Sequence, residues 1–95
     1  MAKIVFIMNV GLAKGWAECI AVQKSDVVPA VGTIVSFQDG YAPVQDVWYD
    51  LVRNHYCVYL GEKNENGEPM CDMRNWSAAE AAKFLRKSGF KVKIH

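Results

Sequence analysis

Val28-Pro-Ala-Val-Gly-Thr-Ile-Val-Ser-Phe-Gln-Asp-Gly-Tyr41 carries the clearest structural signal of this chain. Its apolar and β-branched residues lie between Pro29 and Gly32 on one side and Asp39-Gly40 on the other, which is typical of a strand that ends in a tight hairpin turn. Two further short apolar runs follow over residues 44–50 and 55–60. Short strands separated by Gly, Pro, Asp and Asn predict an antiparallel sheet.

Further elements are predicted on both sides of this region. Residues 3–8 form a continuous apolar run, typical of a strand covered on both faces, and residues 16–23 and 70–76 are interpreted as strands. Ser77-Ala-Ala-Glu80 is a capping box that opens a helix, and Gly89 is suited to end it. The alternating residues 90–95 then predict a final strand that lies near the first.

These elements predict one α+β domain over residues 1–95. We expect five to six mainly antiparallel strands in a strongly bent sheet or an open barrel, with one C-terminal helix over about residues 77–88 followed by a final strand. Val47, Trp48 and Tyr49 are contiguous within residues 44–50, which indicates a β-bulge or a strand that is apolar on both faces.

The bulk composition is that of an ordinary globular protein. The chain has 95 residues, of which 52% are hydrophobic and 22% charged. Three cysteines are too few and odd in number for a disulfide scaffold, and no secretory leader or long apolar segment is found. We therefore expect a reduced, cytoplasmic protein with no membrane partner.

The charge is unevenly distributed along the chain. The formal net charge is +1, which gives no overall attraction to nucleic acid or to anionic lipid. Residues 39–80 carry eight acidic and three basic side chains, whereas residues 81–95 carry five basic and no acidic ones. Two surfaces of opposite charge are the consequence we expect.

No catalytic signature is found. His55 and Cys57 lie two residues apart on one predicted strand, but no orienting third group can be assigned to them. Gly11 to Gly15 lacks the pattern of a phosphate-binding loop, and neither the cysteines nor the histidines have the spacing of zinc ligands. We therefore predict no catalytic residue, no cofactor and no metal, and we favour a non-enzymatic protein over an enzyme without deciding between them.

Protein binding is the first hypothesis for function. Five aromatic side chains lie on the predicted strands and cannot all enter one small core, because neighbouring residues of a strand point to opposite faces. Those outside the core, beside acidic side chains, would form a docking surface for a basic protein partner. The candidate interface residues are Tyr41, Trp48, Tyr49, Tyr56 and Tyr59 with Asp39, Asp46 and Asp50.

Three alternatives stay open. The first is nucleic-acid binding through the basic C-terminal helix and strand, with the candidates Lys83, Arg86, Lys87, Lys91 and Lys93. The second is a small-ligand or enzymatic site in the mouth of the curved sheet, for which a deep pocket lined by His55, Cys57 and Asp46 would argue. The third concerns assembly: an exposed first or last strand could pair edge to edge in a symmetric homodimer.

One resemblance adds to this interpretation. Pro29, Gly32 and Val35 form a Pro-x-x-Gly-x-x-Val entry to a strand, and Val44 and Val47 follow in the next run. Over residues 28–60 this pattern resembles small accessory proteins encoded by phages and mobile elements. The resemblance implies a short cytoplasmic protein that acts as an inhibitor or adaptor by binding a host protein, and it implies no catalytic residues.

Overall fold

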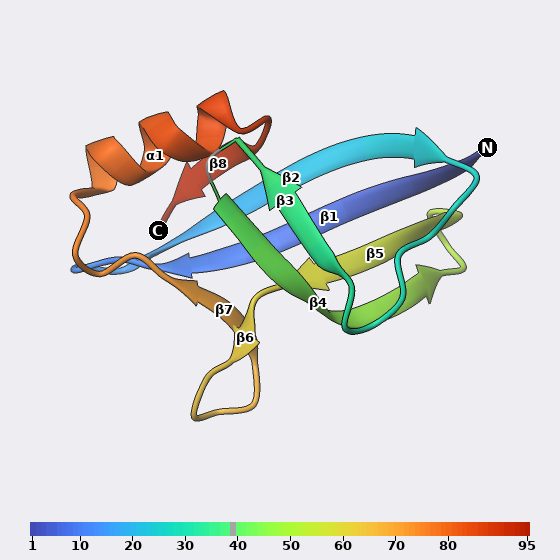
Figure 1. The fold of residues 1–95 in the computed structure, drawn as a ribbon, viewed down its shortest axis with the longest axis horizontal. Coiled ribbons are helices and arrows are strands. Elements are labelled where there is room, and N and C mark those ends of the chain that lie inside the picture. The colour runs from blue at the N-terminus through green and yellow to red at the C-terminus, as the bar shows by residue number, and fades with distance from the viewer. Residues whose placement is uncertain (39) are drawn as a thin grey trace.

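The computed structural model of the protein describes residues 1–38 and 40–95. Figure 1 shows a sheet crossed on one side by a helix and a hairpin. The elements in chain order are β1 (Ala2–Gly11), β2 (Trp16–Ser25), β3 (Ile34–Phe37), β4 (Gly40–Asp50), β5 (His55–Leu60), β6 (Glu62–Lys63), β7 (Pro69–Asp72), α1 (Ala78–Lys87) and β8 (Lys91–Ile94). The predicted α+β class is thereby confirmed.

The sheet has the strand order β3-β4-β5-β1-β2-β8 and is mixed but mostly antiparallel. β1 lies inside it: it pairs with β2 in antiparallel fashion from Ala2 to Gly11 and with β5 in parallel fashion on its other edge. β7 then takes over the place of β5 and pairs in parallel with the last residues of β1. After β5 the chain turns away from the sheet, and β6 pairs with β7 in antiparallel fashion. These two strands and the loop between them form the β6–β7 arm, which projects from the rest of the molecule (Figure 1).

The prediction of a strongly bent sheet or open barrel is wrong, since the sheet is neither closed nor strongly curled. Its two edge strands, β3 and β8, have four residues each and lie at opposite ends of the strand order, so they do not meet. The first strand cannot offer a free edge for a dimer, because β1 is paired on both sides. β8 pairs with β2 and is thus one strand away from β1.

β4 contains the predicted bulge. The register with β5 shifts between Val44 and Asp46, so that Gln45 is the extra residue. β4 begins at Gly40, earlier than expected, because Pro43 still pairs with Ile34 of β3. A proline cannot donate a hydrogen bond, but its carbonyl is free to accept, and that of Pro43 accepts from the Gly61 N–H at 3.0 Å.

α1 has the ends that the sequence predicts. The Ser77 hydroxyl accepts a hydrogen bond from the Glu80 N–H at 3.1 Å and donates to the Glu80 carboxylate at 2.9 Å. At the other end Gly89 has a φ of 101°, and the N–H groups of Gly89 and Phe90 donate to the carbonyls of Arg86 and Leu85. This is a Schellman motif, which a left-handed glycine makes possible.

The core lies between one face of the sheet and a second layer formed by α1 and the β3–β4 hairpin (Figure 1). Phe37 of the hairpin and Phe90 after the helix close this layer, with ring centroids 5.3 Å apart. The largest fully buried side chains are Ile4, Met8, Leu60, Leu85, Val10, Val44, Val58 and Cys19. In the described part of the chain, no helix has the length and apolar character needed to cross a membrane.

Gly61 holds the point where the β6–β7 arm leaves the sheet. Its φ is 125°, and a Cβ there would lie 2.8–3.0 Å from backbone atoms of Met70. Gly61→Ala should therefore destabilise the fold by roughly 3 kcal/mol or more, since the strained backbone and the clash add. Gly67→Ala, at a φ of 77° with open space around it, is the matched control and should cost about 1 kcal/mol. Equal losses in urea unfolding would contradict this explanation.

Candidate docking surface

The sheet face opposite the core is covered by none of the described elements. Its side chains are absent from the core cluster, although they come from the same strands β1, β2, β4 and β5. Because partners in the register point to the same side of a sheet, the pairings place these side chains together. The apolar centre of this surface, which we call the open face, consists of Val5, Ile7, Ile20, Val22, Trp48, Cys57 and Tyr59.

The open face is apolar yet in contact with water. The side chains of Trp48 and Val22 are 64% and 55% exposed, Ile7 and Ile20 are half-buried, and Val5 is buried at 9% exposure. Trp48 and Tyr59 pack together with ring centroids 6.0 Å apart. A contiguous apolar patch of this kind, unlike single exposed residues, indicates an interaction surface.

The borders of the open face carry opposite charges. Asp46 is the register partner of Tyr59 on β4, at one border, and Lys91 is the partner of Ile20 on β8, at the other. Lys93 lies one row further along β8, opposite Glu18. Asp46, Lys91 and Lys93 form no ion pair with the described residues, so each is free to meet a charge on a partner.

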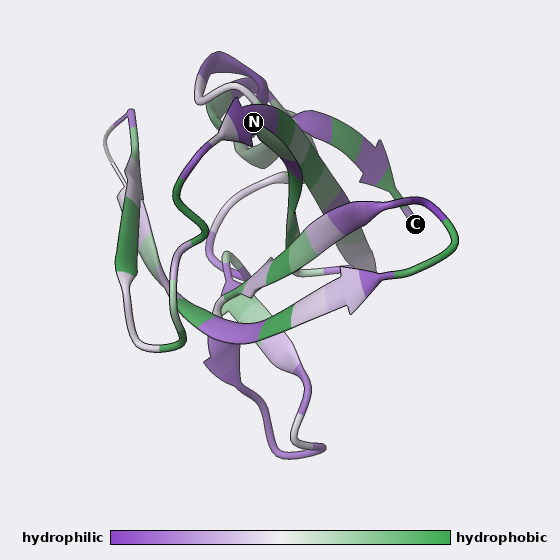
Figure 2. Cartoon of the chain, turned by 90° about the vertical axis from the view of Figure 1, so that its right-hand side faces the viewer, coloured by the Kyte–Doolittle hydropathy of each residue, from purple (hydrophilic) through white to green (hydrophobic). Residues whose placement is uncertain are grey.

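The turn between β4 and β5 extends the acidic border. The Asp50 carboxylate accepts hydrogen bonds from the N–H groups of Val52 and Arg53 and pairs with the Arg53 guanidinium at 3.1 Å. These hydrogen bonds, the Arg53 backbone first, lower the pKa of Asp50. The turn so ordered presents Leu51 and Val52 at 86% and 92% exposure, and Figure 2 shows this hydrophobic turn against the hydrophilic β6–β7 arm.

The predicted aromatic surface divides between two faces. Trp48, Tyr59, Asp46 and Asp50 lie on the side of the open face. Tyr49 and Tyr56 point to the opposite side, where their rings meet edge to face with centroids 4.9 Å apart. Tyr41 stands apart on the β3–β4 hairpin and is 74% exposed. Asp39 lies outside the described residues.

The predicted basic surface divides as well. Lys83, Arg86 and Lys87 are exposed on α1, which packs on the core side of the sheet. Lys91 and Lys93 point to the other side, because Val92 between them packs against the core. The cations of the helix and of the last strand therefore belong to two different surfaces.

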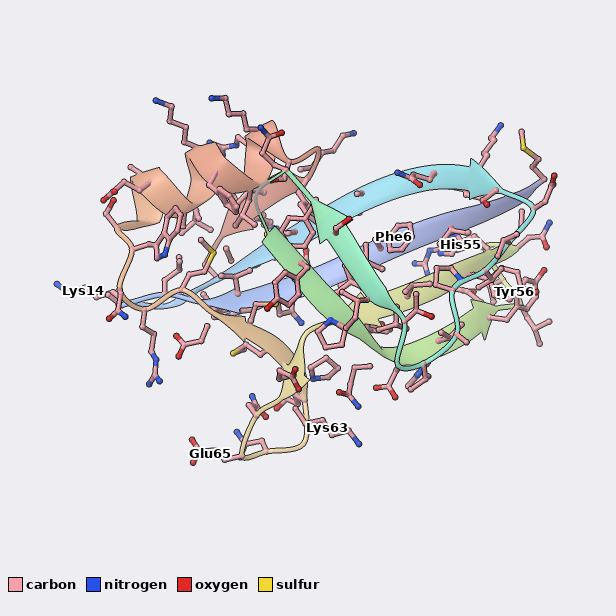
Figure 3. All side chains as sticks on the ribbon, viewed as in Figure 1. Phe6, Lys14, His55, Tyr56, Lys63 and Glu65 are labelled. Carbon is pink, nitrogen blue, oxygen red and sulfur yellow. The ribbon has the colours of Figure 1, made fainter. Side chains whose placement is uncertain are left out.

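The residues considered for chemistry line neither of two hollows found in the described part of the chain. Two hollows of about 560 Å³ and 260 Å³ lie beside the β6–β7 arm and between the β3–β4 hairpin and α1, and neither is lined by His55, Cys57 or Asp46. Figure 3 shows Lys63 and Glu65 out on the arm and His55 at the far end of β5. Burial is the first cause that raises the pKa of Cys57, and the Asp50 carboxylate adds to it.

The sequence hypothesis missed the apolar members of the open face in β1 and β2. The signal was nevertheless there: the continuous run over residues 3–8 is typical of a strand covered on both faces, and the described elements cover one of them. Its alternate members Ile4, Phe6 and Met8 enter the core, which leaves Val5 and Ile7 on the open face. The strand thus has a second apolar side for which this chain supplies no cover among its described residues.

Comparisons add no relative to this description. No protein-family model, no curated protein and no solved structure matches the chain. The site must therefore be interpreted from its own geometry.

The three free cysteines offer a direct measurement of the open face. Burial raises the pKa of Cys19 to about 12 and that of Cys71 to about 11, and both pack in or against the core. In native protein at pH 8, Cys57 should react with a maleimide first, and Cys71 about 100-fold more slowly than free cysteine, because the thiolate is the reactive form. Peptide mapping after timed labelling, with Cys57→Ser as control, checks this order. Labelling of Cys71 before Cys57 would contradict the assignment of Cys57 as the most accessible thiol.

Proposed function

We propose that this protein is a small non-enzymatic protein-binding module that acts by covering a partner's surface with its open face. The observation that carries the proposal is the exposed apolar centre around Trp48, 64% exposed, on a sheet whose other face carries the core. Aromatic side chains at the centre of a surface and charges at its rim are the usual composition of protein interfaces. The accessory, inhibitor or adaptor role implied by the resemblance over residues 28–60 belongs to the same proposal.

The charges define what kind of partner fits. A uniformly basic protein would be attracted by Asp46 and Asp50 but repelled by Lys91 and Lys93 on the other border. A complementary partner is apolar at its centre, basic at one border and acidic at the other. Such charges steer the approach and fix the orientation more than they add to affinity.

Capture from a lysate of the organism that encodes the protein tests the proposal. The tagged protein is used with nuclease at two salt concentrations, and the captured protein is then purified and rebound. Trp48→Ala should weaken the rebinding by about 30-fold, since the loss of a central aromatic anchor costs about 2 kcal/mol. Tyr41→Ala, an equally exposed aromatic side chain on the β3–β4 hairpin, is the matched control and should bind like the wild type.

Two results would contradict the proposal. Equal binding by the Trp48→Ala and wild-type proteins would remove the open face from the interaction. Recovery of nucleic acid alone, lost at high salt and abolished by charge reversal at Lys91 and Lys93, would assign the function to nucleic-acid binding.

A further inference from the structure

We infer that the open face binds a second copy of this chain in a face-to-face β-sandwich, with the two-fold axis parallel to β1. This inference rests on the proposed function and names the partner of the same surface. Two sheets that pack face to face lie about 10 Å apart and bury their inner side chains against each other. Each copy would thereby supply the missing second cover for the other's β1.

The arrangement of charge singles out a second copy. In the row of Ile7 the order across the open face is acidic on β4 (Asp46), apolar on β5, β1 and β2, and basic on β8 (Lys91). Lys3 and Lys24 lie at one end of the face, and Glu18 lies at the other end. A two-fold axis along β1 lays β4 of one copy over β8 of the other, so that Asp46 meets Lys91 of the partner copy in the same row. The contact occurs twice, as it must in a symmetric interface. This row is thus complementary to itself, whereas Lys3 lies beside Lys3 of the partner copy at the end of the face.

The same charges disfavour the other symmetric stacking. A two-fold axis across the strands would lay β4 over β4 and β8 over β8. Neither Asp46 nor Lys91 would then meet an opposite charge, because each strand would lie over its own copy. Only the axis along β1 brings opposite charges together, so the charge pattern favours it over the other in-plane axis.

The apolar residues also find partners under the selected axis. β1 lies over β1, which brings Ile7 against Ile7 of the partner copy, and β5 lies over β2, which brings Cys57 against Val22. In this arrangement the exposed turn of Leu51 and Val52 lies on the same side of the dimer as β2 of the partner copy. The shared face covers about 500 Å² on each copy, or about 1,000 Å² in total, which is near the lower limit of specific interfaces and is typical of a weak dimer.

Sedimentation equilibrium of the full chain at low salt, from micromolar to near-millimolar concentration, is the central experiment. The wild type should form a dimer. Val22→Glu should abolish it, and the high exposure of Val22 makes this variant compatible with folding. Asp46→Lys and Lys91→Glu should each weaken the dimer about tenfold, because each reverses two contacts, and the double variant should return to within about threefold of the wild type. Lys87→Glu on α1 is the control that leaves the affinity unchanged.

Several results would overturn the inference. A wild-type protein that stays monomeric at every concentration, a dimer insensitive to Val22→Glu, or a double variant that is no better than the single ones would each do so. Asp46→Lys that tightens the dimer would indicate the other axis. Maleimide labelling of Cys57 gives an independent measurement: it should slow as the protein concentration rises, while labelling of unfolded protein does not change.

The outcome also separates this inference from the proposed function. The wild type could be monomeric and bind a purified heterologous partner that the Trp48→Ala variant does not bind. This result overturns the inference of a dimer and supports the open face as the docking surface. A monomer that rebinds its partner equally well with and without Trp48 overturns both.

Discussion

The central position of β1 is the constraint on which the rest of the structure depends. This strand pairs over ten residues with the neighbouring β2 and, on its other edge, with β5 and then β7, so two distant parts of the chain must assemble against the β1–β2 hairpin. Its hydrogen bonds are satisfied on both edges, and its two faces are apolar. A strand of this kind is stable only where both faces are removed from water. The helix and the β3–β4 hairpin remove one face, and the chemistry of the other face is what remains to be explained.

The bulge at Gln45 determines what that other face contains. Ala42 and Val44 point into the core, and regular alternation from Val44 would bring Asp46, Trp48 and Asp50 into the core as well. One extra residue shifts the phase, so that Val47 and Tyr49 turn inward instead. The burial of two carboxylates is thereby avoided, since an unpaired buried charge is very costly. The same shift places Asp46, Trp48 and Asp50 on the side of the open face.

Local signals of the sequence predicted most of the elements, and long-range pairings account for what it could not. The helix ends could be predicted because Ser77, Glu80 and Gly89 act within a few residues of each other. The parallel neighbour of β1 and the open form of the sheet could not be predicted, because pairing partners far apart in sequence leave no local pattern. For the same reason the sequence did not show which of the candidate interface residues share a face. Alternation showed that its aromatic residues must divide, but only the β2–β8 register adds Lys91 to the same face as Asp46.

The two charged borders differ in origin, and this bears on how such a surface arises. The acidic border belongs to a hairpin formed by neighbouring segments, β4 and β5, whereas the basic border belongs to a four-residue strand that follows α1 in the chain and pairs with the distant β2. The Schellman motif sets the direction in which the chain leaves α1, and the pairing of His95 with the Trp16 carbonyl at 2.8 Å, together with the stacking of their rings, fixes the end of β8. The charge asymmetry of the open face is therefore complete only in the fully folded chain. A partner that must contact both the acidic and the basic border would not bind a partly folded copy that lacks β8. Two acidic borders alone would repel each other.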